Sequence, residues 1–346
     1  MQPLTDLNFG NFSLDGRSVL ITGGTGSFGN AFVRTVLERY KPARIVIFSR
    51  DEAKQYDMEI ALKSRYAAPL PVRFFIGDVR DQDRLESAMR GIDTVVHAAA
   101  LKHVPAAEYN PFECIKTNVH GAENVVRAAL ANDVQQVVAL STDKAESPIN
   151  LYGASKLASD KIFVAANNVA GTKNIRFSVV RYGNVLGSRG SVLPLFQSLV
   201  KKRATEIPIT DARMTRFFIT LQQGVNFVIS CLGLMKGGEI FVPKIPSIRI
   251  TDLASSVAPG VPHKIIGIRP GEKLHETLIS SDNARNTVEY PQFFVIEPTL
   301  AFWQVSHIDG KDAKPVPQDF VYSSDSNPEW LDGAALSSLL ATAAEK

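Results

Sequence analysis

The first half of the chain alternates short runs of β-branched and other apolar residues with stretches of helical length. The runs that we expect to be strands lie at residues 18–22, 44–48, 72–76, 94–98 and 136–140. Nearly continuous apolar strands are buried on both faces, with the intervening helices as cover. This alternation predicts an α/β fold with a doubly wound parallel sheet. A further apolar run at 239–243 predicts one more strand of that sheet.

A glycine-rich turn follows the first expected strand and opens the first expected helix. In "VLITGGTGSFG" the glycines are spaced G-x-x-G-x-x-G. Glycine permits a tight turn and close backbone approach, so that a pyrophosphate can bind at the helix N-terminus. A glycine turn without a ligand is the alternative, but the surrounding βα units favour dinucleotide binding. The residues expected at this site are Gly23, Thr25, Gly26, Ser27, Phe28, Gly29, Asp78, Val79 and Ala98.

The end of the second expected strand indicates which dinucleotide is bound. An NAD site expects an acidic residue there for the ribose 2′-hydroxyl. This chain has Ser49 followed by Arg50, with Lys54 one helical turn further on. A hydroxyl and a guanidinium suit a 2′-phosphate, which favours NADP. The alternative is that Asp51 binds the ribose; Asp78 is placed to meet the adenine amino group or to cap the next helix.

Three polar residues, Thr142, Asp143 and Lys144, follow the fifth expected strand. Ligands of open α/β sheets bind beyond the carboxyl ends of the strands, so we expect these side chains to face the cofactor crevice. Adjacent side chains of a regular strand point to opposite faces, and the backbone must therefore be irregular here if Asp143 and Lys144 act together. A local ion pair or a helix cap is the alternative interpretation of this pair.

Tyr152 and Lys156 are spaced i and i+4, which places them on one face of the next expected helix. A phenol titrates near pH ~10 in water. A neighbouring ammonium and a charged nicotinamide favour its phenolate form, which can take a proton from a sugar hydroxyl. A surface Tyr/Lys pair is the alternative, but the position after the glycine turn and the fifth strand favours a catalytic role.

The second half of the chain is richer in proline and glycine, which predicts a smaller lobe of loops and short elements where ligand contacts collect. The final segment predicts an extended stretch and a C-terminal helix capped by Asp332. We assign the dinucleotide domain to residues 1–185, with 222–246 returning to it, and the substrate lobe and tail to 186–221 and 247–346.

Composition excludes several other classes of protein. The net charge is +3, and basic residues pair locally with acidic ones, so we expect no nucleic-acid partner. Cys114 and Cys231 lie in apolar patterns and predict buried free thiols in a reducing compartment. The N-terminus lacks signal-peptide features, and polar residues interrupt the apolar stretch 217–235. We therefore expect a cytoplasmic protein with no membrane span; the six histidines show no metal-binding spacing.

Several motifs together resemble a known superfamily. The glycine turn, "HAAALKHV", "STDK", "YGASK" and "RYGNVLGSRGS" are similar to the extended short-chain dehydrogenase/reductases. Longer motifs such as "ITD.RMTRFFITL" and "VPKIPS..ITDLA" more closely resemble the inverting UDP-N-acetylglucosamine (UDP-GlcNAc) 4,6-dehydratases of pseudaminic acid biosynthesis, over nearly all of residues 14–295. The resemblance implies a Rossmann domain, NADP, the substrate UDP-GlcNAc and a homo-oligomer between a dimer and a hexamer.

The resemblance also implies roles for individual residues. Oxidation of C4 to a ketone acidifies the C5 proton, which Lys144 would remove while Asp143 protonates the departing C6 hydroxyl. Hydride would then return to C6, and reprotonation from the opposite face would invert C5. Membrane-anchored retaining relatives carry methionine in place of Tyr152, so the tyrosine fits the inverting branch.

Residues outside these motifs are expected on the nucleotide-sugar side. The resemblance places Lys102 near the sugar or phosphate and Asn184 at the substrate, whereas Arg216 is a candidate diphosphate ligand. Arg269 and Glu272 suit UDP, or alternatively bridge two loops. The functions left open are a UDP-hexose 4-epimerase or C5-epimerising relative, and a non-catalytic NADP-sensing protein.

Overall fold

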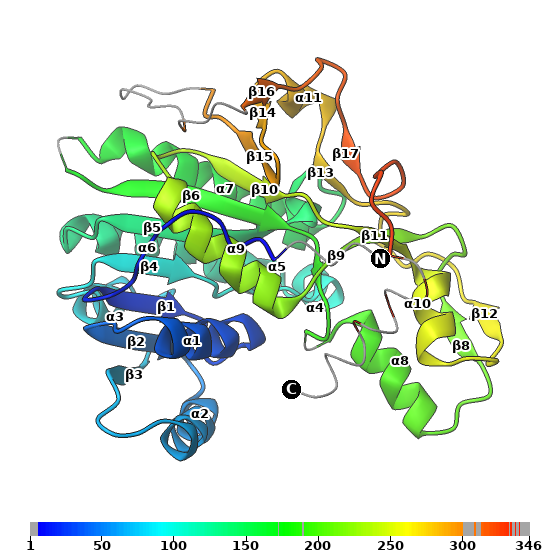
Figure 1. Cartoon of the computed structure of the whole chain (residues 1–346), viewed down its shortest axis with the longest axis horizontal. Helices are drawn as coiled ribbons and strands as arrows, with labels where there is room; N and C mark the ends of the chain where they lie inside the picture. Colours follow the sequence, from blue (N-terminus) through cyan, green and yellow to red (C-terminus); the bar gives the residue numbers. More distant parts are fainter. Residues whose placement is uncertain are drawn as a thin grey trace.

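The computed structural model describes residues 6–171, 173–188, 190–299, 308, 313–331, 333, 336 and 339. A large, mostly parallel sheet forms its centre (Figure 1). Its parallel part has the order β10-β6-β5-β4-β1-β2-β3. These strands are β1 (Ser18–Thr22), β2 (Arg44–Ser49), β3 (Val72–Ile76), β4 (Thr94–His97), β5 (Gln136–Thr142), β6 (Arg176–Tyr182) and β10 (Ile240–Pro243). The predicted doubly wound sheet is confirmed, and each of its first five strands begins at the predicted residue.

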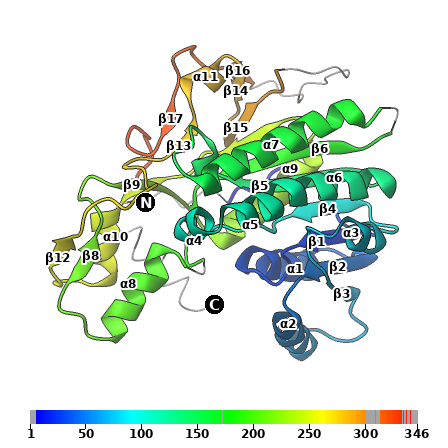
Figure 2. The ribbon, with the colours of Figure 1, turned by 180° about the vertical axis from the view of Figure 1, so that it is seen from behind.

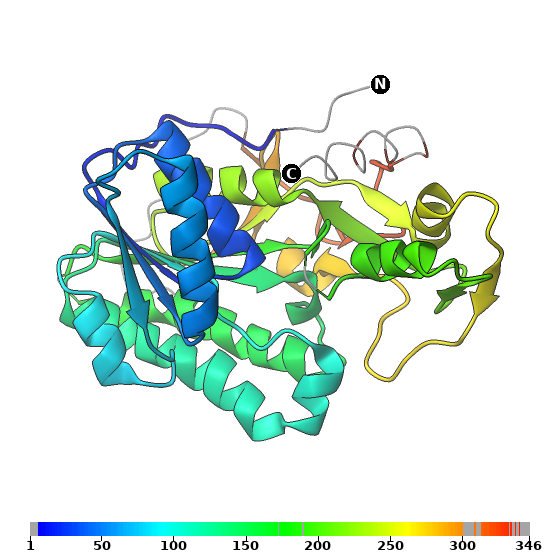
Figure 3. The ribbon, with the colours of Figure 1, turned by 90° about the horizontal axis from the view of Figure 1, so that it is seen from below.

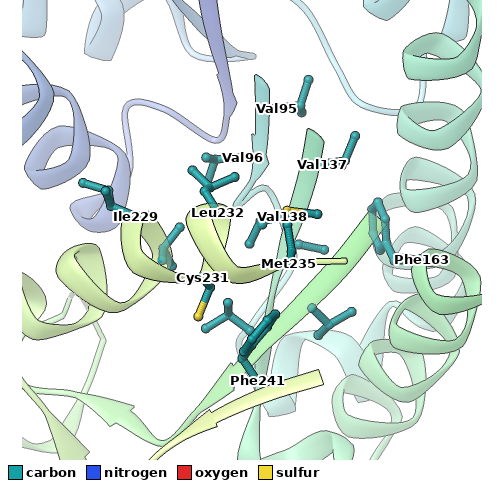
Figure 4. Close-up of a cluster of buried hydrophobic side chains, with 14 of the residues drawn as sticks. Val95, Val96, Val137, Val138, Phe163, Ile229, Cys231, Leu232, Met235 and Phe241 are labelled. Atoms are coloured by element: carbon teal, nitrogen blue, oxygen red, sulfur yellow. The ribbon is translucent and has the colours of Figure 1, made fainter. Parts of the chain in front are cut away.

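Helices cover both faces of the sheet, as Figure 3 shows from below. One face carries α1 (Ser27–Arg39) and α9 (Leu221–Leu234), and the other carries α3 (Gln82–Ala88), α6 (Gly121–Ala131) and α7 (Leu151–Val169) (Figure 2). The helix that connects β2 to β3 is α2 (Glu52–Arg65). The core between these layers is apolar because the strands present valines to both faces, and Phe163 of α7 and Leu232 of α9 close on them from opposite sides (Figure 4).

The far edge of the sheet is antiparallel. β14 (Thr287–Glu289) and β15 (Phe293–Ile296) follow β10, with β16 (Lys314–Pro315) outermost. Residues in this stretch were assigned to the substrate lobe by sequence, but here they extend the main sheet. The physical reason is that β15 supplies hydrogen-bond partners to β10, which would otherwise be an exposed edge strand.

A smaller lobe lies beside the carboxyl ends of the strands (Figure 1). It packs its own apolar cluster, centred on Phe196, Ile209, Phe218 and Leu253. The lobe contains α8 (Val192–Lys201), β8 (Ile207–Ile209), β9 (Thr215–Ile219), β11 (Ser247–Arg249), α10 (Ile250–Val257) and β12 (His263–Ile265). The remaining elements are short: α4 (Val104–Tyr109), α5 (Pro111–Ile115), the π-helix η1 (Lys116–His120), the 3₁₀ turn η2 (Asp143–Ala145), β7 (Asn184–Val185), β13 (Thr277–Ile279), α11 (Ser281–Ala284) and β17 (Tyr322–Ser323).

Other sequence predictions concern single features. Cys114 and Cys231 are buried free thiols. Within the described part of the chain, no helix is long and apolar enough to cross a membrane. Among the same residues no cluster of three or more His, Cys, Asp or Glu side chains could hold a metal ion. The predicted capping residue Asp332 lies outside the described residues.

Candidate active site

A cavity of about 640 Å³ opens where the parallel strands end, between the sheet and the smaller lobe. Every residue predicted for the cofactor site or for catalysis lines it, together with Lys102 and Asn184. The lining also includes residues that the sequence did not single out: Thr117, Tyr182, Ser188, Gly190, Ser191 and Leu221. Tyr182 ends β6, so the rule that sites form at strand ends could have found it.

The glycine turn is shaped by close backbone packing. Gly23 has a positive φ of 65°, and a Cβ there would lie 2.9 Å from the backbone nitrogen of Ala99. A Cβ on Gly29 would lie 2.2 Å from the carbonyl oxygen of Gly24. No side chain caps the N-terminus of α1, which begins after Gly26. The first backbone N–H groups of α1 therefore face a cavity without a side chain in the way, which fits a pyrophosphate.

The end of β2 separates the two interpretations of the ribose site. The carboxylate of Asp51 caps α2: it accepts the backbone N–H of Lys54 at 3.0 Å and also pairs with the Lys54 ammonium. These hydrogen bonds lower the pKa of Asp51 below its ordinary value. The Arg50 side chain, by contrast, is about half exposed, and its contact with the Asp78 carboxylate is long, at 3.5 Å. The Asp51 carboxylate is therefore engaged in capping α2, whereas the Arg50 guanidinium remains exposed at the edge of the cavity.

Asp78 does not cap the next helix. Its carboxylate accepts hydrogen bonds from the backbone and side chain of Arg80 at 2.7–3.0 Å. The cap of α3 is instead Asp81, which accepts the N–H of Arg84 at 2.9 Å. Burial raises the pKa of Asp78, but its bonds to Arg80 outweigh burial and lower it.

The polar segment at the end of β5 leaves the regular strand at the point predicted. β5 ends at Thr142, and Asp143 begins the single 3₁₀ turn η2. The expectation of irregular backbone is confirmed. Asp143 is fully buried, and its Oδ1 accepts hydrogen bonds from Thr142 Oγ1 and Lys144 Nζ, each at 3.0 Å. Its Oδ2 has no hydrogen-bond partner among the described residues.

Lys144 is held between two carboxylates. Its Nζ lies 3.0 Å from Asp143 Oδ1 and 3.1 Å from Oε1 of Glu276, a residue that the sequence did not single out. Burial lowers the pKa of Lys144, but the two carboxylates outweigh burial and raise the pKa above its ordinary value. Lys144 is therefore an ammonium in the protein alone.

Tyr152 and Lys156 occupy the first turns of α7, whose N-terminus Asn150 caps by accepting the N–H of Gly153 at 2.7 Å. Burial raises the pKa of Tyr152 to about 12, against the opposing effects of the Lys144 charge and a hydrogen bond with Thr142. Burial lowers the pKa of Lys156. The protein alone therefore keeps the phenol protonated, whereas the sequence predicted a lowered pKa for it.

Beneath the site, His97 at the end of β4 is 1% exposed and shares a 2.8 Å hydrogen bond between Nδ1 and Thr22 Oγ1. Burial, helped by the charge of Lys156, lowers the pKa of His97 to about 3. The imidazole is therefore neutral at physiological pH, which avoids placing a second cation under Lys156.

A buried ionic network supports the far side of the catalytic turn. The guanidinium of Arg181, 1% exposed, pairs with Glu146 and lies 3.2 Å from Asp160. Asp160 also accepts the hydroxyl of Ser141 at 2.8 Å, and Lys273 donates to the carbonyl of Glu146 at 2.6 Å. The network ties β5, β6 and α7 to the chain just after Lys144.

Asn118, in the π-helix η1, orders the wall that carries Lys102. Its amide bonds both the N–H and the carbonyl of Leu101 at 2.8 and 2.9 Å, and it donates to Ser155 at 2.9 Å. Burial lowers the pKa of Lys102. Asn184 also lines the cavity, and its Oδ1 has no hydrogen-bond partner within the described chain.

The structure does not bring the other expected substrate residues into the cavity wall. Arg216 is buried and donates to the carbonyls of Thr215, Lys273 and Leu274 at 2.7–3.1 Å, with Nε 3.8 Å from Glu276. Arg269 and Glu272 lie 3.6 Å apart within one loop. Arg216 is thus committed to holding the 273–276 segment.

Comparison with known proteins places the chain in a family. A family model described as "Polysaccharide biosynthesis protein" matches residues 19–298. The chain belongs to this family. A relative from Campylobacter jejuni, named "UDP-N-acetylglucosamine 4,6-dehydratase (inverting)", is 57% identical over 91% of this chain and 94% of its own length. The resemblance seen in the motifs is therefore confirmed.

Other family members and solved structures extend the comparison. A protein from Rickettsia canadensis named UDP-glucose 4-epimerase is 44% identical over 81% of this chain and 82% of its own length. The X-ray structure of Pen from Bacillus thuringiensis matches with a TM-score of 0.87 at 37% identity, covering 96% of this chain and 99% of Pen. A dTDP-glucose 4,6-dehydratase from Streptomyces venezuelae, at 23% identity and a TM-score of 0.67, covers 82% of this chain and 93% of its own and shares the fold.

Proposed function

We propose that this protein is a UDP-GlcNAc 4,6-dehydratase that inverts C5, a hydro-lyase that uses NADP. Its product would be UDP-2-acetamido-2,6-dideoxy-β-L-arabino-hex-4-ulose, and the reaction would be the first step of pseudaminic acid biosynthesis. The observation that carries the proposal is the meeting of two pairs in one cavity: Asp143–Lys144 from η2 and Tyr152–Lys156 from α7. The 57% identity to the Campylobacter dehydratase supports it.

The residues present fit a nicotinamide dinucleotide. The glycine turn and the start of α1 would hold the pyrophosphate, and Ser49, Arg50 and Lys54 would hold a 2′-phosphate. NADP is favoured over NAD because the Asp51 carboxylate is already engaged as the cap of α2. When bound, NADP supplies the hydride acceptor for C4 and the hydride donor for C6.

Two sets of side chains would carry out the proton transfers: one set acts at C4 and the other acts across C5 and C6. Tyr152 would take the C4 hydroxyl proton, and the ammonium of Lys156 would favour its phenolate, as would an oxidised nicotinamide. Lys144 would then remove the acidified C5 proton. The C5–H electron pair forms the C5=C6 bond as the C6–O bond breaks, and Asp143 gives the leaving hydroxyl its proton.

This elimination requires one prior proton shift inside the pair. In the protein alone Lys144 is an ammonium. One of its protons must therefore first pass to Asp143 Oδ1, which lies 3.0 Å from Lys144 Nζ. The shift creates the neutral amine and the carboxylic acid together, without changing the net charge of the pair. Asp143 leaves the step as a carboxylate and Lys144 as an ammonium, which restores the starting state.

The substrate would be held by both walls of the cavity. Asn184, with its unpartnered buried Oδ1, suits a donor on the sugar. Lys102 would approach the sugar or phosphate. Arg269 and Glu272 remain proposed contacts to UDP, and Arg216 a proposed diphosphate ligand, although its present bonds favour a structural role.

A second candidate is a 4-epimerase, because the Rickettsia relatives at 43–45% identity bear that name. Such an enzyme needs the C4 oxidation centre but no acid–base pair for water loss. The buried Asp143–Lys144 pair at the cavity therefore favours the dehydratase. An NADP-sensing protein without catalysis would have no need of either pair.

The deciding experiment is incubation of the purified protein with UDP-GlcNAc and NADP, with the products followed by NMR. A 4-keto-6-deoxy sugar with inverted C5 supports the proposal. UDP-N-acetylgalactosamine would identify an epimerase instead, and cofactor binding with no turnover would favour the sensing role. We also propose that the protein is cytoplasmic and forms a homo-oligomer. Light scattering coupled to size-exclusion chromatography would test the oligomeric state.

A further inference from the structure

Glu276 reaches the catalytic turn from a distant part of the chain. It immediately precedes β13, which pairs with β17, and its backbone is fixed by Ser324. The Glu276 N–H donates to Ser324 Oγ at 2.9 Å, and the Ser324 N–H donates to the Glu276 carbonyl at 2.8 Å. The side chain cannot swing freely, because both backbone polar groups are bonded and it is 2% exposed.

The carboxylate of Glu276 faces two cations. Oε1 lies 3.1 Å from Lys144 Nζ and 3.8 Å from Arg216 Nε. Oε2 is buried without a hydrogen-bond partner among the described residues. With Asp143, two carboxylates therefore face Lys144, and Arg216 is a second cation beside Glu276. Burying a carboxylate with one oxygen unsatisfied is costly for stability, which indicates that the group has a use beyond packing.

The elimination gives the two carboxylates different tasks. In the proposed step Asp143 donates its proton to the leaving hydroxyl, so it must first be uncharged. Until that proton has left, Asp143 lacks the full negative charge needed to stabilise the positive charge that grows on Lys144 as it takes the C5 proton. A second carboxylate, in contact with Lys144 but not consumed, would do so, much as a buried carboxylate stabilises a catalytic imidazolium.

We propose that Glu276 is a positioning residue for the elimination step: its carboxylate holds the Lys144 amine toward the sugar and stabilises the ammonium formed when Lys144 takes the C5 proton. The C5–H bond breaks, an N–H bond forms at Lys144, and Glu276 keeps its charge throughout. Arg216 Nε, 3.8 Å from the same carboxylate oxygen, places a second positive charge beside Glu276. This inference rests on the proposed dehydratase function.

The test separates the two halves of the reaction in the Glu276→Gln protein. Glutamine keeps the shape of the side chain and an oxygen toward Lys144 but removes the charge. Entry of solvent deuterium at C5 and formation of the deoxy sugar should fall about 100-fold, the lower end of what general acid–base catalysis contributes. Oxidation at C4, followed as the rise of reduced-nicotinamide absorbance in a single turnover, should keep its wild-type rate, so that the reduced cofactor accumulates.

Two further variants make the outcome decisive. Glu276→Asp keeps the charge and should recover deuterium entry to well above the Gln level. If the Gln protein does not fold, the Asp variant carries the test, because its shorter side chain withdraws the charge from Lys144 and should slow C5 exchange more than C4 oxidation. Glu289→Gln removes a carboxylate at the end of β14 that pairs with Lys244, and it should leave both rates unchanged. The inference is overturned if C4 oxidation and C5 exchange fall equally, or if a folded Asp variant exchanges no faster than Gln. Absence of turnover in the wild-type protein would instead reject the dehydratase function itself.

Discussion

A Cβ on Gly153 would lie 2.2 Å from the carbonyl oxygen of Lys144, so the first turn of α7 rests directly on the backbone of the catalytic turn. Glycine is needed here because any side chain would push η2 and α7 apart. The contact fixes the distance between Lys144 and Tyr152, the residues proposed to act at C5 and at C4.

Gly153→Ala should therefore damage both stability and the elimination step. Overpacking of this kind costs about 1–3 kcal/mol of unfolding free energy, measurable by urea denaturation. The matched control is Gly224→Ala in α9, where a Cβ meets no atom within 4 Å. That change should be neutral or stabilise the helix by up to about 1 kcal/mol. Equal stability of the two variants would show that the close approach is not required.

Lys144→Ala should stop the chemistry at C5 while sparing C4. We expect solvent deuterium to enter C5 at least about 100-fold more slowly, because the general base is lost. Transient reduction of the nicotinamide should persist, since Tyr152 and Lys156 remain, but more slowly, because loss of the Lys144 charge raises the Tyr152 pKa further. Lys264→Ala, which removes an exposed partner of Glu206 in the smaller lobe, is the control. Exchange at the wild-type rate in the Lys144 variant would mean that another group is the base.

His97 should make the folded state sensitive to acid. The folded protein holds its pKa near 3, whereas in the unfolded chain it titrates near 6.5. Below pH 6.5 the unfolded state therefore binds a proton that the folded state does not, so stability falls as the pH drops from 6.5 toward 3. The slope from this one group is at most about 1.4 kcal/mol per pH unit.

The check on His97 is urea unfolding across that pH range. His97→Gln keeps a polar partner for Thr22 but cannot gain the proton, so its stability should change less steeply with pH than that of the wild-type protein. Identical slopes in the two proteins would contradict the predicted shift of the His97 pKa.

Arg50→Ala should weaken NADP far more than NAD. Charge-assisted hydrogen bonds are worth about 1.5–3 kcal/mol, which corresponds to roughly a 10- to 100-fold rise in the Kd for NADP. Titration calorimetry with each cofactor measures the ratio. Arg65→Ala removes a cation of α2 that pairs with Glu38 and should change neither affinity. An equal loss for both cofactors would place Arg50 away from the 2′-phosphate.

Much of the fold was predictable because its signals are local. The strands up to β5 are continuous apolar runs, and the glycine turn, Asp143–Lys144 and Tyr152–Lys156 follow strands whose carboxyl ends must meet at one edge. One of the stretches of helical length, that before β5, is not a single helix: it is split into α5, the π-helix η1 and α6. The split places Asn118 against Leu101, a contact that hydrophobic periodicity does not report.

What the sequence could not provide depends on long-range contacts. Glu276 lies in a loop-like motif, and only folding brings it to Lys144. Arg216 has the chemistry of a phosphate ligand, but the carbonyls of Lys273 and Leu274 engage its guanidinium. The pKa of Tyr152 depends on how deeply the phenol is buried, which spacing alone does not reveal.

The network around Arg181 has a consequence for how the enzyme responds to heat. The cost of removing charged groups from water falls as temperature rises, whereas the gain from apolar burial levels off. Arg181, Glu146 and Asp160, buried directly behind η2, should therefore contribute relatively more to the cohesion of this region on warming. We expect the catalytic turn to stay ordered closer to the melting temperature than elements held by apolar contacts alone.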